Sequence, residues 1–62
     1  MSIKNEYKKI IFINSKGDLA LTKEKDGYYV WHNEIIDIFK DYNIAFEYIK
    51  HLDKENTLEK IN

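Results

Sequence analysis

The stretch Asp26-Gly27-Tyr28-Tyr29-Val30-Trp31-His32 decides the fold, because a tight-turn dipeptide opens directly into a run of large apolar and aromatic side chains. A two-residue hairpin turn needs positive φ, which Gly27 adopts at no steric cost. The alternation of a strand then places Tyr29 and Trp31 on one face and the other three side chains on the opposite face. We therefore predict a central strand over residues 28–32, paired with the segment before the turn.

Two further strands are predicted on the N-terminal side of this stretch. Residues 19–24 alternate apolar and polar side chains, as a half-buried strand does. Residues 7–14 are rich in β-branched and aromatic side chains and are too short for a helix. Residues 15–18 are predicted to form the turn between them, with Gly17 at positive φ.

Both faces of this predicted sheet are apolar. In the first strand, Ile11 and Ile13 are expected on one face. Ile10 and Phe12 are expected on the other. One helix can cover only one face, so a second cover must come from the chain ends or from another molecule.

The segment over residues 35–39 (IIDIF) admits two interpretations, a fourth strand or the beginning of a helix. Its isoleucines favour a strand. Asp41, just beyond it, is suited to cap the free amides at a helix start. In the connection before it, Asn33 is the residue best able to adopt a left-handed conformation. We therefore predict a fourth strand here and a helix after Asp41.

The helix is predicted to run from residue 42 to about residue 54, because apolar side chains recur at steps of three and four residues, at Ala45, Tyr48, Ile49 and Leu52. Phe46 lies about 100° away from this stripe and is not explained by a simple core. Residues 56–59 have a weak capping-box shape and admit two interpretations, a last helical turn or a loose tail.

The predicted fold class is α+β: an antiparallel β-meander of three to four strands followed by one C-terminal helix packed on the sheet. We expect residues 1–62 to form a single domain, with residues 1–6 and 55–62 frayed. A domain of this size buries only about 60% of its unfolded surface and usually needs an additional source of stability. Since the chain has no cysteine for a disulfide, that source is expected to be oligomerisation or a partner.

Composition disfavours several function classes. Ten basic residues, all of them lysine, nearly balance eleven acidic residues, so the net charge of −1 gives no field that would attract nucleic acid or a membrane. The lack of arginine disfavours sequence-specific reading of DNA. The longest apolar runs are four residues, too short for a membrane-spanning helix. We expect a cytoplasmic protein with no cofactor and no metal.

The sequence shows no recognisable set of catalytic or metal-binding residues. The two histidines, His32 and His51, have no hydroxyl nucleophile at a meaningful spacing. His32 and Glu34 could supply two zinc ligands, but no local pattern supplies a third. We therefore predict that the protein is not an enzyme; an enzyme would need a site assembled across a dimer interface from His32 and nearby carboxylates.

A contiguous apolar patch left uncovered usually marks a protein interface, and tyrosine and tryptophan are enriched at binding hot spots. The residues we predict to make contact are Phe12, Tyr29, Trp31 and Phe46. The expected partners are a second copy of the chain, giving a homodimer, and a host protein. The alternative is a single-stranded nucleic-acid-binding accessory protein, in which aromatic side chains stack on bases beside the lysines of the first three strands.

The order of an Asp26-Gly27 turn, a Tyr28-Tyr29-Val30-Trp31-His32 strand, and then Ala45, Glu47, Ile49 and Lys50 on a helix resembles the small phage inhibitors of uracil-DNA glycosylase. The resemblance implies a small phage-encoded inhibitor without chemistry of its own. We therefore expect a non-enzymatic protein of a phage or mobile element. It would bind and inhibit a host protein, either an antiviral defence protein or a DNA-processing enzyme.

Overall fold

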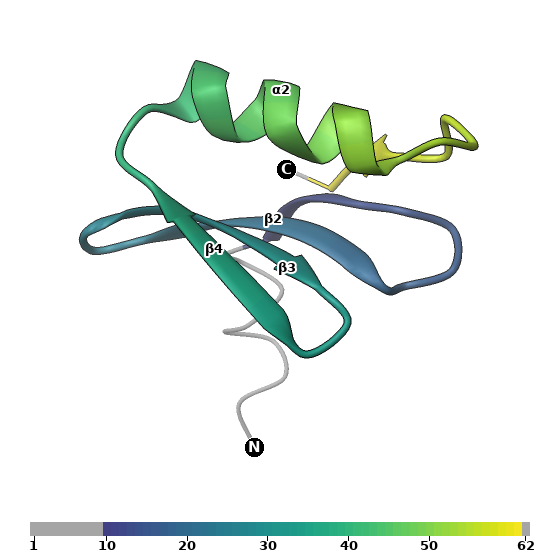
Figure 1. The fold of residues 1–62 in the computed structure, drawn as a ribbon, viewed down its shortest axis with the longest axis horizontal. Helices are drawn as coiled ribbons and strands as arrows, with labels where there is room; N and C mark the ends of the chain where they lie inside the picture. Colours follow the sequence, from purple (N-terminus) through teal and green to yellow (C-terminus); the bar gives the residue numbers. More distant parts are fainter. Residues whose placement is uncertain (1–9, 62) are drawn as a thin grey trace.

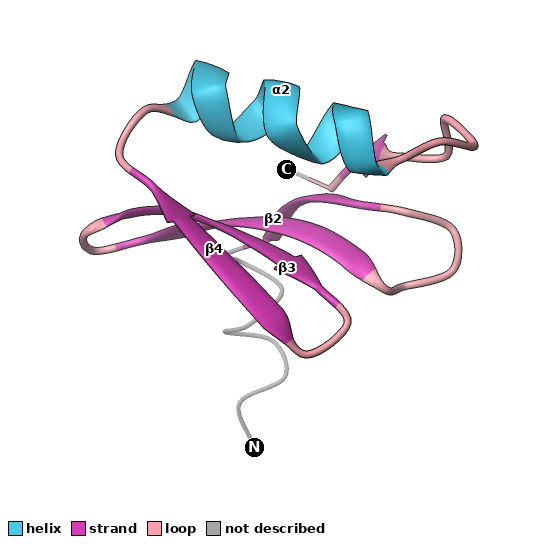
Figure 2. Cartoon of the chain, viewed as in Figure 1, coloured by secondary structure: helices cyan, strands magenta, loops and turns pink. Residues whose placement is uncertain are grey.

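The computed structural model of the chain describes residues 10–61, which form a five-stranded antiparallel sheet with one helix lying across one face (Figure 1). The elements in chain order are β1 (Ile10–Ile13), β2 (Leu19–Glu24), β3 (Gly27–His32), β4 (Ile35–Phe39), α2 (Tyr42–Leu52) and β5 (Glu59–Lys60). The strands are ordered β4-β3-β2-β1-β5 across the sheet. Helix and strands segregate into two layers (Figure 2). The predicted α+β class, a meander with a helix packed on it, is confirmed.

The first four strands agree with the sequence prediction over the residues that the structure describes. Residues 35–39 are a strand, β4, as predicted. Gly17 and Asn33 have positive φ, 79° and 58°, also as predicted. Residues 7–9 of the first predicted strand lie outside the described residues, as does the predicted fraying of residues 1–6.

The hairpin turn between β2 and β3 lies one residue earlier than predicted. Glu24 pairs with Gly27, so the two turn residues are Lys25 and Asp26. Gly27 is the first residue of β3 and has a φ of 148°. A Cβ on Gly27 would collide with the backbone carbonyl of Phe39, at the end of β4. Glycine is therefore required here because β4 approaches closely, as well as for its backbone conformation.

A β-bulge changes the faces of β1. Phe12 pairs with Leu21, but Ile10 pairs with Thr22, so one extra residue is inserted between them on β1. The predicted grouping of Ile10 with Phe12 is therefore wrong. Ile10 shares a face with Ile13, and Phe12 points to the opposite side. An inserted residue reverses the alternation of everything before it, and the β1 sequence carries no mark of the insertion.

Helix α2 begins as predicted, because the Asp41 carboxylate accepts hydrogen bonds from the backbone N–H of Asn43 and Ile44. It ends at Leu52, two residues before the predicted end. The side chain of Asp53 accepts hydrogen bonds from the Leu58 N–H and the Thr57 hydroxyl and so turns the chain back toward the sheet. No helix within residues 10–61 is long and apolar enough to cross a bilayer.

The segment after α2 differs from both interpretations offered by the sequence. Glu59 and Lys60 form β5, which pairs antiparallel with Ile13 and Phe12 of β1. The segment therefore forms neither a last helical turn nor a loose tail. The Ile61 N–H donates to the Ile11 carbonyl, so main-chain pairing holds this segment to the sheet.

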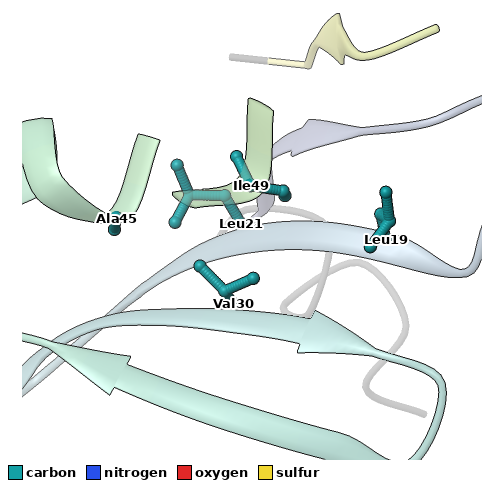
Figure 3. Close-up of a cluster of buried hydrophobic side chains, with 5 residues drawn as sticks. All are labelled: Leu19, Leu21, Val30, Ala45 and Ile49. Carbon is teal, nitrogen blue, oxygen red and sulfur yellow. The ribbon is translucent and has the colours of Figure 1, made fainter. Parts of the chain in front are cut away.

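The core lies between α2 and one face of β2 and β3. Its buried side chains are Leu19, Leu21, Val30, Ala45 and Ile49 (Figure 3). Leu21 and Val30 are directly opposite each other in the β2–β3 register, and Ala45 and Ile49 come down from the helix. The helix therefore covers the middle of one sheet face only.

Candidate protein-binding surface

The sheet face that points away from α2 is covered by no other element among residues 10–61 (Figures 1 and 2), and we call it the outer face. The strand registers place on it side chains from four strands: Ile10, Ile13, Ala20, Thr22, Glu24, Tyr29, Trp31, Ile36 and Ile38. Most of these side chains are apolar or aromatic. The outer face is therefore hydrophobic without being a core.

Large apolar side chains beneath the helix are less exposed than those on the outer face. Leu21 and Val30, on the helix side, are 0% exposed. On the outer face Trp31 is 36% exposed, Ile36 42% and Ile38 56%. Large apolar side chains exposed together on one surface usually serve an interface.

A groove of about 600 Å³ lies in the outer face. Ala20 and Thr22, the small side chains of β2, form its floor. Larger side chains of the neighbouring strands form its walls and ends: Tyr29 and Trp31 on β3, and Ile10 and Ile13 on β1, with Asp18 and Glu24 also in the lining. The hollow exists because β2 carries small residues between two strands that carry large ones.

The Trp31 side chain is held in place by hydrogen bonds within the outer face. Its indole Nε1–H donates to the Thr22 Oγ1 at 2.9 Å, and the Thr22 hydroxyl donates to a Glu24 carboxylate oxygen at 2.9 Å. The indole's single donor is therefore satisfied inside the protein. A partner can pack on the ring without leaving this N–H unpaired.

Tyr29 stands beside Trp31, with ring centroids 6.3 Å apart. Its hydroxyl donates to the Asp26 carboxylate at 3.0 Å, and this hydrogen bond raises the pKa of Tyr29 above its ordinary value. Asp18 and Glu24 also belong to the groove lining. The two rings therefore lie beside carboxylate side chains.

The four predicted contact residues fall into two separate groups. Tyr29 and Trp31 lie together on the outer face. Phe12 and Phe46 lie together on the helix side, with ring centroids 5.1 Å apart, and both are half-buried against the core. Phe46 also stacks on Tyr42 at 5.9 Å. Its departure from the simple helical stripe is explained by this aromatic cluster.

Sequence reasoning missed the isoleucines of the outer face. Ile36 and Ile38 alternate with Asp37 in β4, and this alternation was a signal that one face of β4 is apolar. Ile10 and Ile13 share the outer face only because of the β1 bulge, so no signal in the sequence brought these two together.

A polar cluster lies on the helix side, at the β4 edge. A His32 ring nitrogen is 2.9 Å from an Asp37 carboxylate oxygen, and the Tyr48 hydroxyl donates to the same oxygen at 2.8 Å. These two contacts lower the pKa of Asp37, and the bond to Asp37 raises the pKa of Tyr48. Because Tyr48 belongs to α2 and Asp37 to β4, the cluster fastens the helix to the sheet.

His32, which the sequence pairs with Glu34 as a possible zinc ligand, contacts Asp37 through a ring nitrogen. Within residues 10–61 no three histidine, aspartate or glutamate side chains gather closely enough to hold a metal ion. A second cavity of about 330 Å³, beside the end of α2, is lined by charges of both signs. One pair there, Lys16 and Glu55, is separated by 3.5 Å. Neither charge sign dominates in this cavity.

No protein-family profile, curated protein or solved structure matches the chain. The resemblance to the small phage inhibitors of uracil-DNA glycosylase therefore stays a prediction. The outer face and its groove are the features from which a function can be inferred.

Proposed function

We propose that the protein is a non-enzymatic binding protein that docks on another protein through its outer face. The observation that supports this proposal is the exposed apolar surface formed by Trp31, Ile36 and Ile38 on the side of the sheet away from α2. Keeping such side chains in water has a free-energy cost that burial against a partner removes.

Trp31 is the proposed anchor of this contact. Tryptophan buries a large area and is among the commonest hot-spot residues. Its hydrogen bond to Thr22 fixes the ring before binding, which lowers the entropic cost of association. We expect Trp31→Ala to weaken association by about 2 kcal/mol or more.

The groove indicates what the partner presents. An apolar side chain fits between the β3 aromatics and the β1 isoleucines. Lysine or arginine beside it would face Asp18, an exposed carboxylate in the groove lining. We therefore propose a partner surface with an apolar projection flanked by positive charge.

The biological role that we propose for this contact is inhibition of the bound host protein by a phage or mobile-element protein. Self-association into a homodimer is a further part of the proposal, supported by the same uncovered surface. Light scattering across a hundredfold dilution tests it: a mass near twice 7.5 kDa at every concentration supports the dimer, and a mass of about 7.5 kDa throughout contradicts it.

Site-specific photo-cross-linking tests the docking surface. A photoreactive phenylalanine analogue at position 20, in the groove, should cross-link a specific host protein in the lysate, whereas the same analogue at Glu47, on the exposed side of α2, should not. Trp31→Ala in the cross-linking protein should abolish the product. The matched control is Ile44→Ala, which removes an exposed apolar side chain from the helix.

Thermal unfolding must show that both variants remain folded. If the folded Trp31→Ala protein cross-links as well as the Ile44→Ala protein, the outer face is not the docking surface.

Nucleic-acid binding is the second candidate, because Tyr29 and Trp31 form a half-exposed pair of rings on a sheet surface. Titration with a single-stranded oligonucleotide at low and moderate salt distinguishes the two. Binding that depends on phosphate contacts must weaken steeply as salt rises. No binding at low salt rules this candidate out.

A further inference from the structure

The two edges of the sheet are built differently. The β5 edge consists of two residues, Glu59 and Lys60, both charged and exposed. The β4 edge consists of five residues with the sequence IIDIF, and each of them pairs with β3 in one unbroken register. Natural sheets protect their edges with short strands, lysines, prolines or bulges. The β5 edge is protected in this way, whereas β4 is longer and unbroken and carries a single charge, that of Asp37.

Hydrogen bonds elsewhere in the sheet show which way its backbone groups point. The Leu19 carbonyl accepts from the Asn14 N–H, on the β1 side of β2. Because successive residues of a strand turn their backbone groups to opposite sides, Ala20 turns toward β3, where Trp31 is its partner. Trp31 thus faces β2, and its neighbours along β3 face β4.

The same alternation reaches the β4 edge. Val30 faces β4, and its partner there is Asp37. Asp37 therefore directs its backbone groups toward β3, while Ile36 and Ile38 direct their N–H and C=O groups away from the sheet. Only another extended backbone can bond both residues in register, because the two donors and two acceptors are spaced as in a strand.

The isoleucine side chains of β4 are also exposed. Ile36 and Ile38 stand on the outer face, and Ile35, on the other face, is 55% exposed. A long, largely apolar edge strand without a proline or bulge is a template for strand addition.

A second copy of β4 fits this edge poorly. The antiparallel register that uses both outward-facing residues pairs Ile36 of one copy with Ile38 of the other, which places the two Asp37 residues directly opposite each other. Like charges directly opposite in a sheet are destabilising. The side chain of Asp37 is fixed in place by His32 and Tyr48, so it cannot easily turn away. A foreign strand with a lysine or arginine at that position meets no such repulsion.

We propose that the β4 edge binds an extended segment of the partner protein, which adds to the sheet as a new strand. Its alternate apolar side chains would lie beside Ile36 and Ile38 and continue the outer face. A basic side chain between them would face Asp37. This inference rests on the proposed protein-binding function and names the form of the partner: an extended apolar strand with a central positive charge.

Synthetic eight-residue peptides test this proposal, with valine and threonine alternating around a central lysine. Two controls match it: one with glutamate in place of the lysine, and one N-methylated on alternate amides, which keeps the side chains but cannot pair. In ¹⁵N-labelled protein, we expect the lysine peptide at about 1 mM to shift the Ile36 and Ile38 amides and slow their hydrogen exchange. The glutamate peptide should bind about fivefold more weakly, and the N-methylated peptide at least about tenfold more weakly.

Three results overturn the proposal: no shift at Ile36 and Ile38, equal binding of the N-methylated peptide, or shifts confined to groove residues such as Ala20. Without peptide, exchange at these two amides that becomes slower as the protein concentration rises also overturns the proposal, because it indicates that β4 pairs with a second copy. The Ile36→Lys protein, in which a lysine blocks the edge, should lose peptide binding.

Failure of this inference can be told apart from failure of the proposed function. If Trp31-dependent cross-linking persists while no peptide binds the β4 edge, the docking function stands and strand addition is wrong. If peptides bind the edge while the folded Trp31→Ala protein still cross-links, the outer-face proposal is wrong instead.

Discussion

The two faces of this sheet come from the same strands, yet only one of them is a core. On the helix side, Leu21 and Val30 meet Ala45 and Ile49 from α2 and are buried completely. On the outer face, the same two strands carry Thr22 and the half-exposed aromatics beside it. The difference shows that apolar character alone does not bury a side chain. Of the apolar side chains on both faces, those beneath α2 are the ones that become buried. One 11-residue helix covers one face.

The contacts on the two faces also differ in kind. Aliphatic side chains pack around one another on the covered face, where their burial stabilises the fold. On the outer face, hydrogen bonds from Trp31 to Thr22 and from Tyr29 to Asp26 fix aromatic rings that remain exposed. The covered face therefore supplies stability, and the outer face presents a preorganised surface.

Matched threonine substitutions on the two faces should show the largest contrast. Val30→Thr keeps the β-branched shape but buries a hydroxyl in an apolar core, and we expect a loss of about 2 kcal/mol in the free energy of unfolding. Ile38→Thr places the hydroxyl in water and should cost less than about 0.5 kcal/mol. Urea unfolding of both variants measures the contrast. Equal losses would mean that the outer face is also covered.

Weakening the helix that covers the core should have a smaller effect. Asp41→Ala removes the acceptor for the free amides of Asn43 and Ile44, and we expect a loss of about 1 kcal/mol. Asp41→Asn keeps an acceptor oxygen and should retain most of the stability. The check is thermal unfolding at neutral pH. If Asp41→Asn is destabilised as much as Asp41→Ala, the stabilisation comes from the carboxylate charge and not from the capping hydrogen bond.

The smallest effect is expected at the cluster that fastens α2 to β4. Because His32 and Tyr48 lower the pKa of Asp37, its contribution is fully present above the ordinary value of 3.8 and is lost as pH falls through the lower folded-state pKa. The Tm difference between the native protein and Asp37→Asn should therefore shrink between about pH 5 and about pH 2. Glu47→Gln, which removes an exposed helix carboxylate, is the control. A difference that does not change with pH would show that this pKa shift does not contribute to stability.

Much of the fold could be predicted because the local signals agree with the packing. The alternation of β2 and β3, the positive φ of Gly17 and Asn33, and the Asp41 cap each depend on neighbours a few residues away. Features that depend on nearby residues in this way can be predicted from the sequence alone.

What the sequence did not reveal depends on contacts between distant segments. The β1 bulge is set by pairing with β2, and β5 forms only because residues 59–60 reach β1. At the candidate site, Tyr29 and Trp31 were predicted as neighbours because strand alternation places them together. Phe12 and Phe46 were also predicted to make contact, because the sequence does not show which face the helix covers. Their ring contact belongs to the helix side.

The last strand has a consequence for how the chain folds as it is synthesised. β1 lies between β2 and β5, so the strand made first among residues 10–61 gains its second neighbour only when residues 59–60 emerge. Until then, within residues 10–61, β1 pairs with β2 alone, and an unpaired strand edge can bind other nascent chains. This late, long-range closure raises the contact order of a very small protein, and we expect it to fold more slowly than its length alone suggests.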